Sequence, residues 1–128
     1  MEQKLITFAV PCYNSAAYMR HCVDTLLTAG PDAEIILIDD GSTKDDTPAI
    51  CDEYAAKYPG VVRAIHQENG GHGEGVNQGI RHAAGIYYKV VDSDDWLDTD
   101  ALAKVLDRLR LLLHRGTAPD LMLCNYVY

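Results

Sequence analysis

The chain has 128 residues, of which 48% are hydrophobic and 23% charged, and its formal net charge at pH 7 is −8. This length fits one domain with its own core, and the composition is that of a globular protein and argues against disorder. An acidic chain without a cluster of Lys and Arg repels phosphate backbones, so no nucleic acid is expected as a partner.

The first apolar run, Leu5–Val10, is too short for the core of a signal peptide or for a membrane span. We therefore expect a cytoplasmic protein. Any association with the inner face of the membrane is expected to come only from sequence outside this chain.

The cysteines are Cys12, Cys22, Cys51 and Cys124, and none of them shows Cys-x-x-Cys spacing. Zinc sites and disulfide frameworks need closer pairing than this. The pattern therefore predicts reduced, mostly buried thiols.

A first strand is expected over Leu5–Val10, because a continuous β-rich apolar run is typical of a strand buried on both faces. Pro11 is expected to end this strand, and Asn14 or Ser15 is expected to cap the following helix. That helix is expected over Ala16–Thr28, where apolar residues recur at helical spacing.

A second buried strand is expected over Glu34–Ile38, followed by a loop over Asp39–Ser42. Thr47 is expected to cap the next helix, with Pro48 at its first position, where the missing N–H of proline costs nothing. A third, shorter strand is expected over Val61–His66.

Further elements follow in the second half of the chain, again from their hydrophobic periodicity and end signals. In order, they are the Gly-rich loop Asn69–Gly75, a short helix through Ala84, a strand over Ile86–Val91, a helix over Asp100–His114 capped by Thr99, and a fifth strand over Leu121–Tyr128.

This alternation of buried strands and helices predicts an α/β fold with a doubly wound, mostly parallel sheet. Such sheets bind ligands beyond the carboxyl ends of their strands, near the point where the strand order reverses. The expected strand exits that carry unusual chemistry are Pro11–Asn14, Asp39–Ser42 and Asp92–Asp95. Their convergence at one edge is the main indication of a functional site.

The segment Asp92–Asp95 contains the carboxylates of Asp92, Asp94 and Asp95 close together at a strand exit. Such carboxylates repel one another unless a cation lies among them, and hard oxygen ligands suit Mg²⁺ or Mn²⁺. The alternative is a solvated acidic turn that leads into the last helix. The position of the segment beside the other two strand exits favours a metal site.

Tyr13 and the pair Asp39 and Asp40 are ambiguous when each is taken alone. The ring of Tyr13 could stack on a nucleobase, or it could pack on its neighbours in a rigid turn. One aspartate of the pair could accept hydrogen bonds from a base or a ribose. In isolation, however, an Asp-Gly turn is the better interpretation.

The loop Asn69–Gly75 is rich in glycine and opens a helix, so its backbone N–H groups could approach a phosphate or a sugar closely. It lacks the Gly-Lys-Ser/Thr of a Walker A loop, and it does not follow the first strand as a dinucleotide-binding glycine motif does. The alternative is a flexible surface loop.

Taken together, these motifs resemble the family 2 glycosyltransferases, and the resemblance covers nearly all of the chain. Its blocks, in order, are Pro11-x-Tyr13-Asn14, Asp39–Ser42, Asn69–Gly71 with Asn77 and Gly79 beyond it, and Asp92–Leu97. The resemblance implies the GT-A fold, a Rossmann-like doubly wound sheet that is truncated here.

The resemblance implies inverting transfer of a sugar from a nucleotide-diphosphate donor, often a UDP-sugar, to a saccharide or lipid-linked acceptor. It also implies Mg²⁺ or Mn²⁺ as cofactor and suggests a role in the synthesis of cell-surface polysaccharide or glycoconjugates. The substrate-binding residues that it implies are Pro11, Tyr13, Asn14, Asp40, Gly71, Asn77 and Asp92, and the metal ligands are Asp94 and Asp95.

Within this set, Pro11 and Tyr13 would line the base pocket, and Asp40 would bind the base or the ribose. Asp92 would lie on the ribose or metal side, and the metal ligands would hold the cation against the diphosphate. One departure is Val76, which stands before Asn77 where many relatives have Arg.

A second departure concerns the general base, which in the family is an acidic residue well downstream of the metal motif. The base is expected beyond Tyr128, the last residue of this chain. We therefore expect a truncated, donor-binding domain that is inactive alone.

Two other readings remain open. One is a non-catalytic nucleotide-binding module. The other is a phosphoacceptor receiver domain, which fits less well because receivers carry their acidic pair after the first strand.

Overall fold

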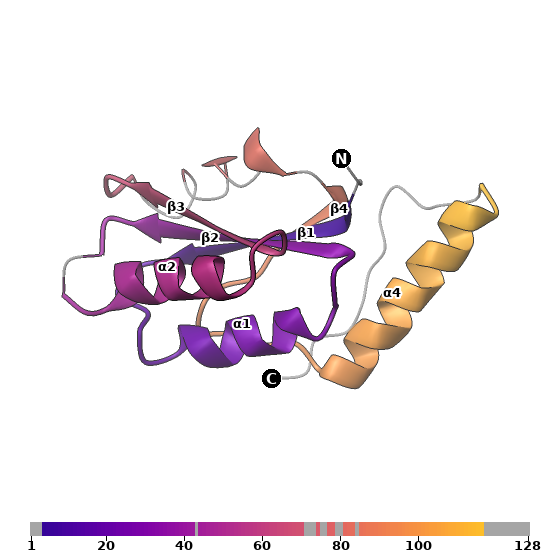
Figure 1. Cartoon of the computed structure of the whole chain (residues 1–128), viewed down its shortest axis with the longest axis horizontal. Coiled ribbons are helices and arrows are strands. Elements are labelled where there is room, and N and C mark those ends of the chain that lie inside the picture. The colour runs from indigo at the N-terminus through magenta and orange to yellow at the C-terminus, as the bar shows by residue number, and fades with distance from the viewer. Residues whose placement is uncertain are drawn as a thin grey trace.

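The computed structural model describes residues 4–42, 44–70, 74, 77–78, 81–83 and 85–116. Within them a parallel sheet has the strand order β3-β2-β1-β4 (Figure 1). Its strands are β1 (Lys4–Cys12), β2 (Ala33–Asp40), β3 (Val62–Gln67) and β4 (Gly85–Val90). The order reverses at β1, since β2 and β3 lie on one side of it and β4 on the other. This arrangement confirms the doubly wound α/β sheet that the sequence predicts.

Helix α1 (Met19–Leu27) connects β1 to β2, and α2 (Thr47–Lys57) connects β2 to β3. Helix α4 (Thr99–His114) follows β4. Figure 1 shows α1 and α2 side by side along one face of the sheet, with α4 set at an angle to them. Residues 74, 77–78 and 81–82, between β3 and β4, are also helical.

The core lies on both faces of β1 and β2, because alternate residues of a strand point to opposite faces. Phe8, Val10 and Leu37 belong to the larger core cluster, which also contains buried residues of α1, α2 and α4. Ala9 and Ile36 belong to a smaller cluster that also contains Ile38. Burial on both faces explains why these strands read as continuous apolar runs.

The bounds of β3 and β4 and the starts of β1 and β2 differ from the expectation by one residue, whereas the carboxyl ends of β1 and β2 lie two residues later than expected. β1 continues through Pro11 to Cys12, because parallel pairing with β2 persists to the register Cys12↔Asp39. β2 likewise continues through Asp40, so Asp39 and Asp40 are the last residues of a strand and not part of a loop. The pair of aspartates is therefore held by the sheet itself.

The first predicted helix cap is wrong. α1 begins at Met19 after Tyr18, which makes no side-chain capping hydrogen bond. The carbonyl of Ser15 instead accepts hydrogen bonds from the N–H groups of Tyr18 and Met19, at 2.9 Å each. This turn precedes the helix. Neither Asn14 nor Ser15 is therefore the capping residue.

The other two caps are displaced by one residue. Thr47 is the first residue of α2, after Asp46, and Pro48 is the second. Asp98 caps α4, because its side chain accepts a hydrogen bond of 2.9 Å from the N–H of Ala101. Thr99, the predicted cap, is the first residue of that helix.

Cys12, Cys22 and Cys51 are free and buried, as the sequence predicts. Cys124 and the predicted fifth strand, residues 121–128, lie outside the described residues. Among the described helices, none has the length and apolar character needed to cross a membrane.

Candidate functional site

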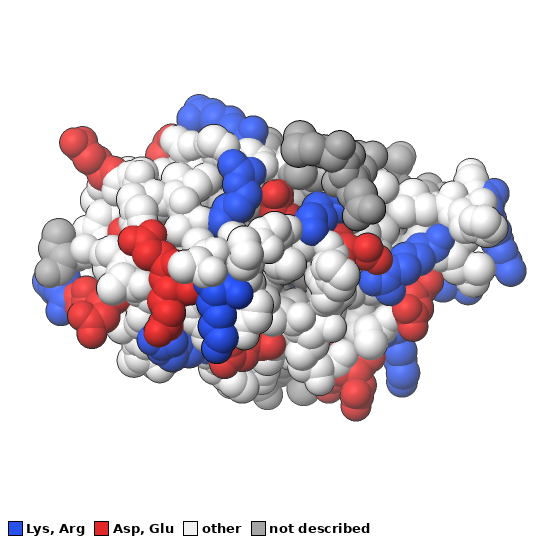
Figure 2. Space-filling view, in the orientation of Figure 1, with Lys and Arg blue, Asp and Glu red and all other residues white. Residues whose placement is uncertain are grey.

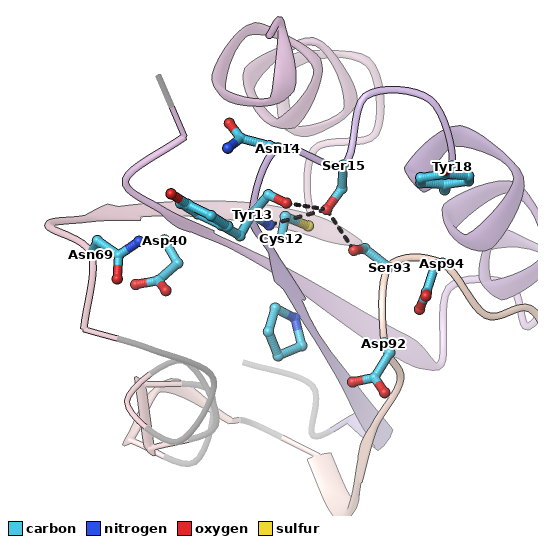
Figure 3. Close-up of a pocket in the computed structure, with 11 residues that line it drawn as sticks. Cys12, Tyr13, Asn14, Ser15, Tyr18, Asp40, Asn69, Asp92, Ser93 and Asp94 are labelled. Carbon is cyan, nitrogen blue, oxygen red and sulfur yellow. Dashed lines mark hydrogen bonds between the residues drawn. The ribbon is translucent and has the colours of Figure 1, made fainter. Parts of the chain in front are cut away.

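A cavity of about 510 Å³ lies at the carboxyl edge of the sheet (Figure 3). The exit of β1 contributes Pro11, Tyr13 and Asn14, and the end of β2 contributes Asp40. The segment after β4 contributes Asp92 and Asp94. Because β1 is the strand at which the order reverses, the cavity occupies the place where doubly wound sheets bind their ligands. Aspartates distant in sequence thus line one cavity, as the motifs predict.

The acidic segment after β4 forms a compact cluster. Carboxylate oxygens of Asp92, Asp94 and Asp95 lie within 4.8 Å of one another. The turn that gathers them is closed by a hydrogen bond of 2.9 Å from the N–H of Asp95 to the carbonyl of Asp92. Burial and the neighbouring carboxylates of Asp94 and Asp92 raise the pKa of Asp95. Hard carboxylate oxygens in this arrangement fit Mg²⁺ or Mn²⁺, which would offset their mutual repulsion.

Figure 2 shows one molecular face, on which Lys and Arg side chains are interspersed among Asp and Glu. On that face the negative charge is not gathered into one patch. The acidic cluster after β4, in contrast, brings three carboxylates together without a basic residue among them.

The acidic segment is anchored to the exit of β1. Ser93 is buried, and its hydroxyl lies 2.7 Å from the hydroxyl of Ser15. The Sγ of Cys22 in α1 lies 3.6 Å from the carbonyl oxygen of Asp92. These contacts hold Asp92 and Asp94 at the cavity (Figure 3).

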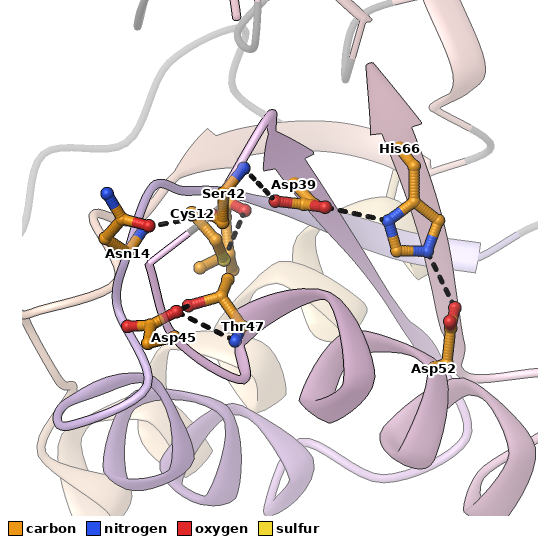
Figure 4. Close-up of polar contacts among 9 residues, drawn as sticks. Cys12, Asn14, Asp39, Ser42, Asp45, Thr47, Asp52 and His66 are labelled. Atoms are coloured by element: carbon orange, nitrogen blue, oxygen red, sulfur yellow. Dashed lines mark hydrogen bonds and ion pairs between the residues drawn. The ribbon is translucent and has the colours of Figure 1, made fainter. Parts of the chain in front are cut away.

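The exit of β1 is in turn fixed to the segment after β2 (Figure 4). The N–H of Asn14 donates to the hydroxyl of Ser42 at 2.9 Å, and the N–H of Ser15 donates to the hydroxyl of Thr47 at 2.8 Å. Asn14 has a φ of 48°, a conformation that asparagine tolerates better than most residues. Its side-chain oxygen accepts a hydrogen bond from the N–H of Lys44. Asn14 thus lines the cavity while bracing two loops.

Tyr13 lines the cavity and is 51% exposed, so about half of its surface is free to contact a ligand. Its N–H donates to the hydroxyl of Ser15 at 3.0 Å. The backbone is therefore fixed while the ring stays accessible to a ligand (Figure 3).

The two aspartates at the end of β2 have different partners. Asp40 lines the cavity, and its Oδ1 accepts hydrogen bonds from Gln67 Nε2 and from the N–H of Gly70, each at 2.8 Å. Asp39 instead accepts a hydrogen bond from the N–H of Ser42 at 3.1 Å and lies 2.9 Å from Nδ1 of His66. Successive residues of a strand point to opposite faces, which separates the two carboxylates.

The imidazole of His66 lies between two carboxylates (Figure 4). Its Nε2 is 2.7 Å from Asp52 on α2, and its Nδ1 faces Asp39. Hydrogen bonding to Asp39, and then to Asp52, raises the pKa of His66 to about 9. Sequence analysis missed both His66 and Gln67. No local motif marks them, because their role depends on the register that pairs them with Asp39 and Asp40 across β2 and β3.

A sequence model described as glycosyl transferase family 2 matches residues 7–125. The chain belongs to this family. It is 38% identical over 127 residues to the putative glycosyltransferase EpsH of Bacillus subtilis, an alignment that covers 98% of this chain and 35% of EpsH. It is 45% identical over 94 residues to the glycosyltransferase GlyG of Streptococcus pneumoniae, covering 72% of this chain and 31% of GlyG. The chain therefore spans about a third of the length of these relatives.

Solved structures agree with this family assignment and with the GT-A fold. S. aureus TarS 1-349 in complex with UDP-GlcNAc superposes with a TM-score of 0.71 at 26% identity, over 83% of this chain and 32% of that chain. The mannosyltransferase PcManGT from Pyrobaculum calidifontis, in complex with GDP-Man and Mn²⁺, also gives a TM-score of 0.71, at 25% identity over 85% of this chain and 33% of that chain.

The receiver-domain alternative is wrong for this glycosyltransferase family 2 chain. Its strand order is β3-β2-β1-β4, whereas receiver domains have the order 2-1-3-4-5. The acidic residues also lie at the end of β2 and after β4, and not after β1.

Not every residue implied by the family resemblance lies at the cavity. Asn77 is exposed and is not among the described residues that line it. Asp95 belongs to the acidic cluster but not to the cavity lining. Gly71, Val76 and the region beyond residue 116 lie outside the described residues.

Proposed function

We propose that this chain binds a nucleotide-diphosphate sugar, a UDP-sugar, together with Mg²⁺ or Mn²⁺ as the donor of an inverting glycosyl transfer. The observation that carries the proposal is the single cavity lined by Tyr13, Asp40 and Asp94, with the acidic cluster at its edge. A TarS structure in complex with UDP-GlcNAc and a PcManGT structure in complex with GDP-Man and Mn²⁺ have the same fold, which supports a donor of this class.

The nucleoside is assigned to the β1 and β2 side of the cavity. Tyr13, with Pro11 beside it, stacks on the base, since base stacking needs an accessible aromatic face. Asp40 accepts hydrogen bonds from the base or the ribose. Asn14 shapes this side of the site by bracing the loops around it.

The diphosphate is assigned to the β4 side of the cavity. A diphosphate and a cluster of carboxylates repel each other in direct contact, so a divalent cation is needed between them. Asp94 and Asp95 would hold this cation, and Asp92 would lie on the ribose or metal side. When bound, the cation neutralises charge on the departing nucleoside diphosphate.

The acceptor is a saccharide or a lipid-linked saccharide in the synthesis of cell-surface polysaccharide or glycoconjugates. Inverting transfer requires a base that deprotonates the acceptor hydroxyl. Because the chain spans about a third of the length of its curated relatives, we expect this chain alone to bind the donor without transferring the sugar.

Calorimetric titration tests the proposal with UDP and GDP, each with and without Mn²⁺. We expect UDP to bind in the presence of Mn²⁺ and Asp94→Ala to abolish the metal-dependent part of binding. Asp100→Ala is the matched control, because Asp100 is an exposed carboxylate in the first turn of α4. Titrations of the unchanged chain that are flat for both nucleotides under all conditions would overturn the proposal.

A further inference from the structure

We propose that Gln67, the last residue of β3, is a positioning residue that fixes the carboxylate of Asp40 for recognition of the nucleoside. This inference rests on the proposed function, in which Asp40 contacts the base or the ribose. Gln67 itself is not part of the cavity lining, so it acts through Asp40 and not through the ligand.

The contact between the two side chains follows from the strand register. Gln67 and Asp40 are Cα partners at the ends of β3 and β2. The Nε2 of Gln67 donates to Asp40 Oδ1 at 2.8 Å, and the N–H of Gly70 donates to the same oxygen at 2.8 Å. Hydrogen bonds to a charged acceptor are among the stronger ones in proteins, so these two donors restrict how the carboxylate can turn.

The carbonyl oxygen of the Gln67 amide lacks a hydrogen bond in this arrangement. Its Oε1 is buried and has no hydrogen-bond partner among the described residues. A buried acceptor left without a partner destabilises the fold, and an apolar side chain of the same length would avoid that loss. Turning the amide over would instead set its carbonyl oxygen against Asp40, two acceptors in contact. The loss at Oε1 offsets the stability gained from the hydrogen bond to Asp40, so the amide contributes little net stability but still orients the carboxylate.

The backbone at Asp40 is already held, which leaves the side chain as the group to be oriented. Gly41 has a φ of 72°, and a Cβ at this position would lie only 2.7 Å from the backbone nitrogen of Asn69. Asn69 lines the same cavity as Asp40 (Figure 3). The turn after β2 thus packs against the segment after β3, and Gln67 adds control of the carboxylate.

The last two residues of β3, His66 and Gln67, each contact a different aspartate of β2. His66 contacts both Asp39 and Asp52 on α2 (Figure 4), and none of these three residues lines the cavity. Gln67 faces Asp40, which lines the cavity. One aspartate therefore braces the fold, and the other is presented to the ligand.

The substitution Gln67→Met tests the proposal, because it keeps the side-chain length and removes both the donor and the buried acceptor. In titrations with UDP and Mn²⁺ we expect affinity to fall about tenfold, the equivalent of ~1.4 kcal/mol. The melting temperature is expected to stay unchanged or to rise. Gln78→Met is the matched control, since Gln78 Nε2 also donates to a carboxylate, that of Glu74, at 3.2 Å. Its affinity for UDP is expected to stay unchanged.

A double-mutant cycle with Asp40→Asn separates a positioning role from a merely structural one. If Gln67 acts through Asp40, adding Gln67→Met to Asp40→Asn causes little further loss of affinity. The proposal is overturned by an additive double variant, by full affinity in Gln67→Met, or by a loss of affinity that accompanies a lower melting temperature. Failure of the unchanged chain to bind UDP would instead overturn the proposed function.

Discussion

His66 connects β3 to both β2 and α2 through its two ring nitrogens. Its side chain is 42% exposed, whereas that of Asp39 is 5% exposed and that of Asp52 is 66% exposed. The contact with buried Asp39 is therefore the principal one. Asp39 also accepts a hydrogen bond from the N–H of Ser42, and the hydroxyl of Ser42 accepts one from the N–H of Asn14. His66 is thus linked through Asp39 and Ser42 to Asn14, which lines the cavity.

The raised pKa of His66 predicts a pH dependence of stability. Its pKa is about 9 in the folded chain, against 6.5 for an ordinary histidine. A raised pKa means that the stabilisation is complete below pH ~6.5 and is lost as the pH rises through ~9. We expect His66→Gln to lower the free energy of unfolding at pH 6 by about 1 kcal/mol or less, because solvent screens an exposed pair.

Chemical denaturation at a series of pH values measures this difference. The gap between the unchanged chain and His66→Gln should shrink between pH ~6.5 and ~9. His82→Gln, at another exposed histidine, serves as the control. A gap that is the same across the whole range would show that the charge of His66 does not stabilise the fold.

The residues of the candidate site were predictable where chemistry is concentrated in a short segment. Tyr13, Asp40 and Asp94 line the cavity because the carboxyl ends of parallel strands meet at one edge. Gln67 and His66 were not predictable in the same way. Their importance depends on which residues they face across β2 and β3, and that register is not written in any local motif.

At the scale of elements, the turn after β2 and the turn after α2 offer a matched pair of glycines. Gly41 and Gly60 have φ values of 72° and 84°, so a side chain at either position is strained. Gly60 has open space around it, whereas a Cβ at Gly41 would lie 2.7 Å from the backbone nitrogen of Asn69. Only the turn after β2 packs against another segment of the candidate site.

We expect Gly41→Ala to lower the free energy of unfolding by about 1–3 kcal/mol more than Gly60→Ala, because overpacking adds to the shared backbone strain. Urea denaturation of both variants measures the difference. We also expect Gly41→Ala to weaken UDP binding, since it displaces the segment that contains Asn69. Equal losses of stability in the two variants would contradict the close approach of Gly41 to the backbone of Asn69.

Helices and strands were predictable from periodicity, but their ends were not. Thr47 has the chemistry of a cap, yet it is the first residue of α2, and its hydroxyl accepts a hydrogen bond from the N–H of Ser15. The end of β2 shows the same limit, since Asp39 and Asp40 read as loop residues but pair with His66 and Gln67 on β3. Contacts between residues distant in sequence determine where these helices and strands begin and end, so local sequence patterns do not predict the bounds.

For the whole molecule, the alternation of buried strands and helices predicted the parallel sheet and its functional edge. The strand order β3-β2-β1-β4 then sets β1 between the two polar strand exits. The side of β2 carries Asp40 and the side of β4 carries the acidic cluster, with Tyr13 between them on β1's own exit. A nucleotide bound across this point would meet Tyr13 and Asp40 at one end and the acidic cluster at the other.

Under the proposed function, one cation would lie between the acidic cluster and the phosphates of the nucleotide. Pulsed electron paramagnetic resonance of Mn²⁺ tests it directly, with UDP bound to protein that is isotope-labelled at the aspartate carboxyl carbons. We predict couplings from one Mn²⁺ ion to both phosphorus and an aspartate carboxyl carbon, with the carbon coupling lost in Asp94→Ala. Protein-bound Mn²⁺ that couples to phosphorus without any aspartate carbon, or to aspartate without phosphorus, would contradict the account.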